Sequence, residues 1–486
     1  MKRSHAAAAL VVLVVLAGCS TPFSGGAPSV PGGDGDDGAD DSTAAAGGST
    51  TDFSDPASDR LGWEAGYWHN ESIDVDQSDG LSDAEIDAFV GRSMARVEYI
   101  RGIEFESEVP VEVIARSEYR NESSEVATPA DSDFAAWNNQ VWEALFISGE
   151  DENVQRQLSD TQGSSVVGFY SPSDDEIKII TETPDSPVIR NTTLVHELVH
   201  AAQDQRFDLT DDVYRGETQD SDLAIDGLIE GDANYVQREY SQRCASGEWE
   251  CVATPSQNSG SSGPQPNLGI LLTVFQPYSD GPVYVNSRKE AGGWAAVNDE
   301  FDSPPESTEQ TIHVTDDDPV PIEFSDRARN GWELYPEQGT EGSDTVGEAS
   351  IFAMFWYQAR ASNADTVDPR GLTRTDSPYD TYNYGAEPSA GWGNDRVFPY
   401  HKGSGPSAEY GYVWVTEWDT ERDAREFLGA YRAILRAQGA TQEADRVWVV
   451  AEGPYADAFR VTRSGTRVVI VNAPTTDDLS DVRPRG

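Results

Sequence analysis

Two histidines four residues apart, set within an apolar stretch, constrain the fold more than any other feature of the chain. The segment 196–200 reads H-E-L-V-H, and only six histidines occur among the 486 residues. Positions i and i+4 lie on one face of an α-helix, so in a helix both imidazoles can reach a single metal ion. The pattern therefore predicts a helix that starts after the capping residues 191–193, runs to about residue 206 and presents His196 and His200 as metal ligands.

A catalytic zinc site needs a third protein ligand and keeps one position open for water. Few histidines remain outside this segment, which favours a carboxylate as the third ligand. Glu230 lies 30 residues after His200, a separation that allows one helix to end and an antiparallel neighbour to return. We expect Glu230 to be that ligand, on a second helix over residues 222–241. Asp222 and Asp232 are weaker candidates.

Side chains around the ligands are expected to orient them. A metal-bound imidazole is usually held by a hydrogen bond to its second ring nitrogen. Asp226 and Asn234 share one helical face with Glu230, so either could orient a histidine ligand. Asp204, one helical turn beyond His200, is another candidate for this supporting role.

Glu197 lies next to the first histidine and can hold a metal-bound water on the same face. Zinc lowers the pKa of such a water toward neutrality, and Glu197 would accept its proton and pass it to a leaving amine. His313 is a candidate donor to the developing oxyanion; alternatively, it is an exposed or capping loop histidine. A peptide could pair with the strand expected over residues 165–170, as extended peptides do with edge strands. These residues predict a zinc-dependent hydrolase that acts on peptide bonds.

The chain is strongly acidic, with 86 acidic and 34 basic residues and a formal net charge of −52. An excess of this size, spread along the chain, is typical of a surface adapted to high salt, where screening removes self-repulsion. It argues against nucleic acid as a partner. The alternative, a protein that mimics a polyanion, is disfavoured because the acids run through the expected elements instead of forming one block.

The N-terminus has the form of an export leader. Lys2 and Arg3 precede an apolar run, 6–16, that is too short to span a bilayer. Residues 16–19 resemble a lipobox, in which the cysteine is lipidated; the alternative is an ordinary signal peptide with a chance cysteine. We expect Cys19 to carry a lipid that anchors the protein to the membrane, with its body at the extracellular face.

Two further cysteines, Cys244 and Cys251, would lie in a compartment that permits disulfides if the chain is exported. They could close a small loop around residues 246–250. A metal-binding role is less favoured, because neither a histidine nor a further cysteine lies nearby.

The segment 196–205, together with residues 228–233, resembles the gluzincin pattern of metallopeptidases, the clan that includes thermolysin. The chain departs from thermolysin-like enzymes in having Asn234 where they have an aspartate, and in a longer spacing to the third ligand. The resemblance implies zinc as the cofactor. The residues that it implicates are the ligands His196, His200 and Glu230, the base Glu197, and Asp204 and Asn234 close to the ligands.

A wider pattern, from about residue 60 to 475, resembles a family of surface lipoproteins from halophilic archaea. The stretches that carry it are 307–313, 346–348 and 391–396. This resemblance implies an exported, membrane-tethered protein with a peptidase-like domain. Glu348 and the Asp395-Arg396 pair could line the cleft; alternatively, they are a helix-capping carboxylate and a buried ion pair.

The fold class expected is α+β, with a gluzincin-like core of an antiparallel hairpin or sheet, an active-site helix and a second ligand helix. A mixed region and a C-terminal β-α-β-β-β layer follow. The expected segments are a signal peptide (1–18), a disordered stalk (19–58), a metallopeptidase-like domain (59–244), a flexible loop (245–267), a mixed helical region that completes the cleft (268–400), an α/β subdomain (401–475) and a tail (476–486). Further helices are expected over 83–101, 135–147, 349–359 and 420–438, and strands over 111–114, 165–170, 176–181, 412–417, 447–451, 458–462 and 467–471.

Two functions remain open from the sequence. The first is a cell-surface zinc metallopeptidase. The second is a non-catalytic binding or structural lipoprotein of the surface layer with a vestigial metal site. The presence of Glu197 favours the first, because a structural metal site does not need a general base.

Overall fold

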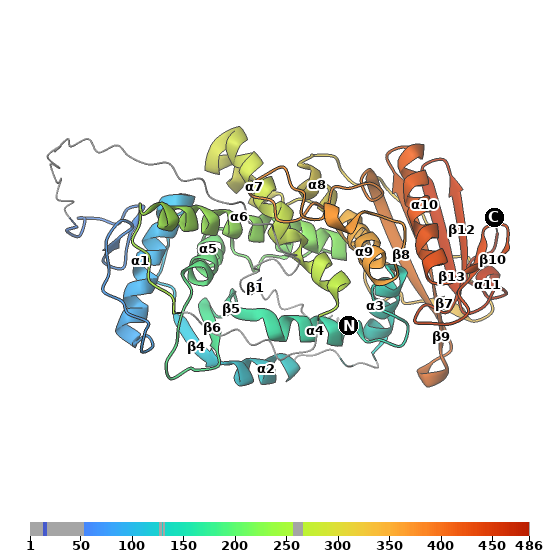
Figure 1. Ribbon diagram of the computed structural model, residues 1–486, viewed down its shortest axis with the longest axis horizontal. Coiled ribbons are helices and arrows are strands. Elements are labelled where there is room, and N and C mark those ends of the chain that lie inside the picture. The colour runs from blue at the N-terminus through green and yellow to red at the C-terminus, as the bar shows by residue number, and fades with distance from the viewer. Residues whose placement is uncertain (1–12, 17–52, 126–128, 130–131, 256–265, 486) are drawn as a thin grey trace, which may run out of the picture.

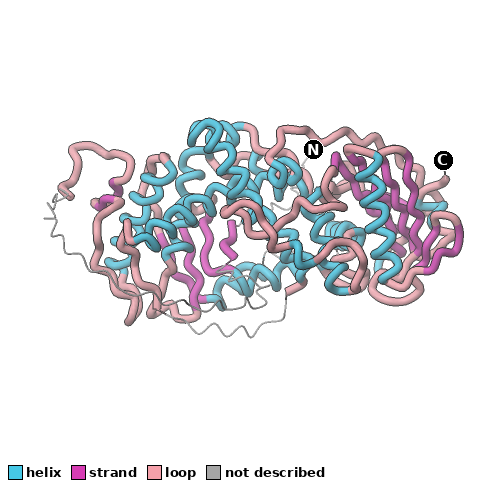
Figure 2. The backbone as a smooth tube through the Cα atoms, turned by 45° about the horizontal axis from the view of Figure 1, so that its top comes forward, coloured by secondary structure: helices cyan, strands magenta, loops and turns pink. Residues whose placement is uncertain are grey.

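The computed structural model describes residues 13–16, 53–125, 129, 132–255 and 266–485. The fold is α+β, as the sequence predicts. Of the three β-sheets that the described residues form, the two larger lie toward opposite ends of an elongated molecule, with helices packed between them (Figure 2). The candidate metal ligands lie on two of these helices.

The N-terminal sheet has four strands in the order β1-β5-β6-β4. Strands β5 and β6 form the expected hairpin, but β4 joins it in parallel, so the sheet is mixed and not antiparallel throughout. Ile177 and Ile179 are buried on one face, with the half-buried Lys178 between them, and Ile180 is buried on the opposite face, so the end of this strand is covered on both sides. The strands are β1 Leu13–Leu16, β4 Val111–Ala115, β5 Val166–Ser171 and β6 Glu176–Thr181.

Helix α1, Asp83–Arg101, has the bounds that the sequence predicts. Ser82 and Glu85 form a capping box at its start, and Gly102 ends it in the left-handed conformation with a φ of 76°. The helix packs against the two helices that carry the candidate ligands. A short hairpin precedes it and three helices follow it: β2 Trp63–Glu64, β3 Tyr67–Trp68, α2 Arg116–Glu125, α3 Asp133–Ala144 and α4 Val154–Ser165.

Helices α5, Asn191–Phe207, and α6, Gln219–Ser246, pack against each other and correspond to the two expected ligand helices. Helix α6 begins three residues before the expected start because the side chain of Thr218 caps it. Residues 191–193, which have the composition of a cap, form the first turn of α5 instead, and Arg190 takes the cap position without a side-chain hydrogen bond.

Helix α7, Leu268–Asp302, is not predicted by the sequence, because two internal prolines and a Gly-Gly pair argue against a long helix. The helical run is interrupted at Gly293, whose φ is 70°. Helix α7 approaches α6 closely: a Cβ atom added to Gly231 of α6 would lie 2.4 Å from the backbone of Gly281 in α7. This contact between glycines brings α7 against the part of α6 that contains Glu230.

The C-terminal sheet has seven strands in the order β10-β11-β12-β13-β9-β8-β7, and α10, Glu421–Ala437, packs on one face (Figure 1). The predicted strand–helix–strands succession is present, and β7, β8 and β10 are additional. The boundary expected at 400/401 falls inside β8, and the expected tail contains helix α11, whose Leu479 and Val482 are buried. The remaining elements are α8 Thr308–His313, β7 Trp332–Leu334, α9 Gly347–Ala361, β8 Trp392–Lys402, β9 Glu409–Trp418, β10 Thr441–Ala444, β11 Val447–Val449, β12 Ala458–Ser464, β13 Arg467–Ala473 and α11 Leu479–Val482.

Most of the expected leader and stalk, including Cys19, lies outside the described residues. Residues 13–16 of the leader are described, and they form β1, which runs antiparallel to β5. Within the described part of the chain, no helix combines the length and the apolar character needed to cross a membrane.

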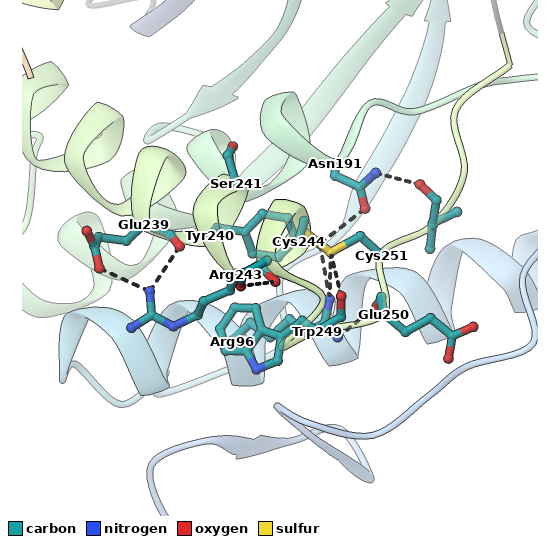
Figure 3. The surroundings of a disulfide bond; sticks show 12 residues. Arg96, Asn191, Glu239, Tyr240, Ser241, Arg243, Cys244, Trp249, Glu250 and Cys251 are labelled. Carbon is teal, nitrogen blue, oxygen red and sulfur yellow. Dashed lines mark hydrogen bonds and ion pairs between the residues drawn. A yellow bond between two sulfur atoms is a disulfide. The ribbon is translucent and has the colours of Figure 1, made fainter. Parts of the chain in front are cut away.

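Cys244, near the end of α6, is joined to Cys251 by a disulfide bond, the pairing expected from the sequence (Figure 3). The bond closes a loop that contains Trp249 and Glu250. Of the flexible loop expected over 245–267, residues 256–265 lie outside the described residues.

Candidate metal centre

The candidate metal centre lies between α5 and α6. His196 and His200 belong to α5 and Glu230 to α6, and each is at most 2% exposed. The Nε2 atoms of His196 and His200 lie 2.9 Å and 3.5 Å from Oε2 of Glu230. Ligand atoms about 2.0–2.1 Å from a tetrahedral zinc ion are about 3.3 Å apart, so these three side chains are spaced to share one ion.

Three buried polar atoms of the H-E-L-V-H side chains have no hydrogen-bond partner among the described residues, namely Nδ1 of His196, Nε2 of His200 and Oε1 of Glu197. The other oxygen of Glu197, Oε2, accepts a hydrogen bond of 2.9 Å from the backbone N–H of Tyr170 on β5. A buried polar atom left unpaired costs about 1–3 kcal/mol. A cation held by the imidazoles, with a water beside Glu197, would satisfy Nε2 of His200 and Oε1 of Glu197. The residues therefore fit a metal ion.

The charges of these side chains depend on one another. Burial raises the pKa of Glu230, but the charge of His200 and the hydrogen bonds from both histidines outweigh it and lower the pKa to about 2. Burial lowers the pKa of His200, but the charge of Glu230 outweighs it and raises the pKa to about 9. Burial raises the pKa of Glu197 to about 8. A cation at this site would favour ionised Glu197 and neutral His200.

Gln203 orients His200, a role that the sequence suggested for Asp204, Asp226 or Asn234. Its Nε2 donates to the backbone carbonyl of Ile229 and to Oδ2 of Asp232, each at 3.0 Å. Its Oε1 therefore faces Nδ1 of His200 at 2.9 Å, and Arg101 holds Asp232 through a 2.7 Å ion pair. Because Nδ1 of His200 must donate to this oxygen, its Nε2 keeps the lone pair that a metal needs. The sequence signal was its position three residues after His200, on the same helical face.

Gln203→Met is expected to weaken zinc binding by about 10- to 100-fold, because it removes the acceptor that fixes the His200 tautomer. The affinity can be measured by competition with a chromophoric chelator. Gln205→Met is the matched control, since the Gln205 amide lies on the same helix but bonds the backbone of Ser107. Equal affinities of the two variants would contradict the role assigned to Gln203.

Tyr278 of α7 is a candidate functional residue that sequence reasoning missed. Its hydroxyl donates to Oε1 of Glu230 at 2.9 Å, and its ring lies nearly parallel to that of His196, with centroids 6.5 Å apart. Burial raises the pKa of Tyr278 well above its ordinary value, so the hydroxyl remains a donor at neutral pH. Periodicity gave no signal for it, because Tyr278 lies 48 residues after Glu230 on a helix that the sequence does not predict.

Asp204 supports the site through strand β5 and not through an imidazole. Its carboxylate accepts hydrogen bonds from the hydroxyl of Tyr170 at 2.8 Å and from the N–H of Leu209 at 2.7 Å. Tyr170 is the residue whose backbone holds Glu197. The expectation that Asp204 orients a histidine is corrected accordingly, because its side chain turns toward β5 and the end of α5.

Asn234 and Asp226 of α6, expected to orient a histidine, do not bond either imidazole among the described residues. Asn234 donates its amide to the backbone carbonyl of Glu230 at 3.0 Å, so it does not orient an imidazole. Burial raises the pKa of Asp226. The charge of nearby Glu230 raises it further, and the charge of His200 lowers it. Among the described residues, the Asp226 carboxylate makes no hydrogen bond to either histidine.

The structure does not bring His313 together with the metal ligands. Its Nε2 lies 3.0 Å from both carboxylate oxygens of Glu348, in the first turn of α9. Asp395 on β8 accepts a 2.9 Å hydrogen bond from the indole N–H of Trp414, and the alternative of an ion pair between Asp395 and Arg396 is not observed. These residues belong to the junction of α8, α9 and the C-terminal sheet.

One part of the chain matches a known family model. Residues 333–483 match DUF8575, a domain of unknown function. This stretch covers α9 and the C-terminal sheet and does not include the three candidate ligands. Neither the curated proteins nor the solved structures contain a match to the chain. The chemistry of the metal centre is therefore inferred from its own residues.

Proposed function

We propose that the protein is a zinc-dependent peptidase. The observation that carries the proposal is the buried group of His196, His200 and Glu230, with Glu197 beside it presenting one unpaired oxygen. Catalytic zinc sites use three protein ligands and keep a position open, whereas structural sites are closed by four. A fourth protein ligand is not found near this group among the described residues.

Three residues around the metal ligands would have separate roles in peptide hydrolysis. Bound zinc would supply a water of lowered pKa and polarise the peptide carbonyl. Glu197 would accept the proton of the attacking water through Oε1 and return it to the leaving amine, while the N–H of Tyr170 fixes the direction of its carboxylate. We assign to Tyr278 the role of oxyanion donor that the sequence suggested for His313. Its hydroxyl lies beside Glu230, and its single proton, which Oε1 of Glu230 accepts in this structure, would turn to the oxyanion when substrate is bound.

A peptide substrate would bind as an extended strand along β5. The pairing of β1 with this edge supports the idea, since Leu13 lies opposite Tyr170 and Val14 opposite Phe169 in an antiparallel register. The backbone groups of an edge strand pair with extended chains of many sequences. Cleavage of the leader before Cys19 would remove residues 13–16 and free this edge.

The setting that we propose follows from the two resemblances. The H-E-L-V-H segment and Glu230 support a gluzincin-like core, and the leader supports export with a lipid on Cys19. The protein would then act on peptides or proteins at the extracellular face of the membrane of a halophilic organism. A net charge of −52 is consistent with this setting and argues against a nucleic-acid partner.

Removal of the metal tests the proposal. The full chain, purified in high salt, should contain about one zinc ion and cleave members of a mixed peptide library. A chelator should abolish cleavage, and added zinc should restore it. Glu230→Gln should lose zinc and activity together. The control Glu239→Gln should keep both, because Glu239 lies further along α6 and pairs with Arg243.

The same measurements of zinc content and peptide cleavage distinguish the peptidase from the alternative function. A protein that binds zinc stoichiometrically but leaves every peptide in the library intact would be a non-catalytic surface lipoprotein. A protein that binds no divalent metal would contradict both readings of the site.

A further inference from the structure

Helix α1 buries three arginines, two of which lack an ionic partner. Arg92 and Arg96, one helical turn apart, are 1% and 0% exposed. Arg101, also fully buried, forms an ion pair with Asp232. Among the described residues, no carboxylate oxygen lies within 4.0 Å of a nitrogen of Arg92 or Arg96. Buried charges in proteins are normally paired, so two neighbouring guanidinium groups without counter-charge require an explanation.

Arg96 makes four of its five possible N–H contacts, all of them to neutral acceptors, and its Nη2 makes only one (Figure 3). It donates to the backbone carbonyls of His69 at 2.8 Å and Glu250 at 2.9 Å, and to the hydroxyl of Tyr240 at 3.2 Å. It also contacts the sulfur of Cys251 at 3.6 Å. These contacts fix the guanidinium group against the disulfide loop, where it lies 4.7 Å from the centre of the Trp249 ring, and none of them supplies a negative charge.

Arg92 has hydrogen-bonding capacity that the described residues do not use. Its Nε and Nη2 atoms are buried and have no acceptor. Burial and then the charge of Arg96 lower its pKa to about 10, so it remains charged at neutral pH. The charges of Glu250 and Glu71 partly offset this lowering of the pKa, but both carboxylates form hydrogen bonds with other groups. Glu71 accepts from the N–H of Trp68 at 3.2 Å, and Glu250 accepts from the hydroxyl of Ser72 at 2.6 Å.

We propose that Arg92 and Arg96 form a binding site for a small inorganic anion of the chloride class. Near-complete burial of both side chains favours a monatomic ion over a carboxylate or phosphate group. A chain with a net charge of −52 repels anions in general, so retention of one requires a local excess of positive charge such as this pair. The high-salt setting that the composition indicates would supply chloride in excess.

The bound anion would stabilise one particular junction of the fold. Arg92 and Arg96 lie on α1, and the acceptors of Arg96 lie on α6 and on the loop closed by the Cys244–Cys251 disulfide. A counter-ion would therefore hold α1 against the C-terminal end of the helix that carries Glu230. By linkage, the folded state would gain stability as the chloride concentration rises.

The site can be tested on the full chain by replacing chloride with bromide. Crystals grown in sodium bromide should show an anomalous difference peak at hydrogen-bond distance from Nε and Nη2 of Arg92. In solution, the melting temperature at a fixed, high sodium concentration should rise as chloride replaces gluconate. Arg92→Met should lose this chloride-dependent rise. Arg288→Met should keep it, because Arg288 is paired with Glu300 and Asp316 away from the site.

Each result decides the question. An anomalous peak at Arg92, or a chloride response lost only in Arg92→Met, supports the site. Electron density for water without anomalous signal in bromide shows that water satisfies the guanidinium group. A full chloride response in Arg92→Met equally overturns the proposal, even if that variant is less stable throughout.

Discussion

Glu197→Gln is expected to lower peptide cleavage by about 10²- to 10⁴-fold while leaving zinc binding unchanged. Glu197 is fully buried next to the three ligands but is not one of them. A glutamine keeps the size of the side chain and can still accept the hydrogen bond from the N–H of Tyr170, yet it cannot take a proton from water. Zinc content and turnover of one library substrate, measured on the same preparation, check the prediction.

Glu309→Gln is the matched control for this variant. Glu309 is also buried, and burial raises its pKa to about 8 as it does for Glu197, but it lies on α8 outside the metal centre. A neutral amide replaces a carboxyl group whose burial already favours the protonated form, so the fold and the activity should be retained. Full activity of Glu197→Gln would rule out the role of Glu197 as base.

Asp232→Ala is expected to destabilise the metal-free protein by about 3–5 kcal/mol, since it leaves Arg101 buried without a partner. Both side chains of this ion pair are 0% exposed, and their nitrogen and oxygen lie 2.7 Å apart. The substitution also removes an acceptor of the Gln203 amide, so zinc affinity should fall in parallel. Chemical denaturation at constant high salt, in the presence of a chelator, measures the stability effect without the contribution of bound metal.

Two comparisons make this result specific. Arg425→Ala removes an exposed ion pair with Glu421 and should change the free energy of unfolding by less than about 1 kcal/mol. The double variant Arg101→Met, Asp232→Leu removes both charges and should recover much of the stability lost in Asp232→Ala. Equal stability of Asp232→Ala and the natural protein would show that water or another group compensates Arg101.

Short-range patterns were sufficient to predict the elements that carry the ligands. The spacing of His196 and His200 requires only that one segment be helical, and α5 is the helix predicted there. The capping box at Ser82 gave the start of α1, and the alternation around Lys178 gave strand β6. Each of these signals depends on residues within one or two turns of the chain.

Helix α7 shows where such signals fail. Its prolines and glycines lower its intrinsic helix propensity, and its packing against α6 through Gly231 and Gly281 overrides that penalty. The same packing brings Tyr278 to Glu230, a contact that no spacing along the chain indicates. Similarly, Gln203 and Asp204 are neighbours on α5, and the position of Asp232 on α6 decides which of them supports His200.

The amino-acid sequence alone determined the histidine pair, the glutamate adjacent to it, the preference for a carboxylate as third ligand and the strongly acidic composition. The tertiary structure alone decided that Glu230 meets the two imidazoles, that Tyr278 and Gln203 complete the centre, and that His313 lies with Glu348 instead. The physical reason is that backbone geometry sets distances within a helix, whereas packing between distant segments sets distances between helices.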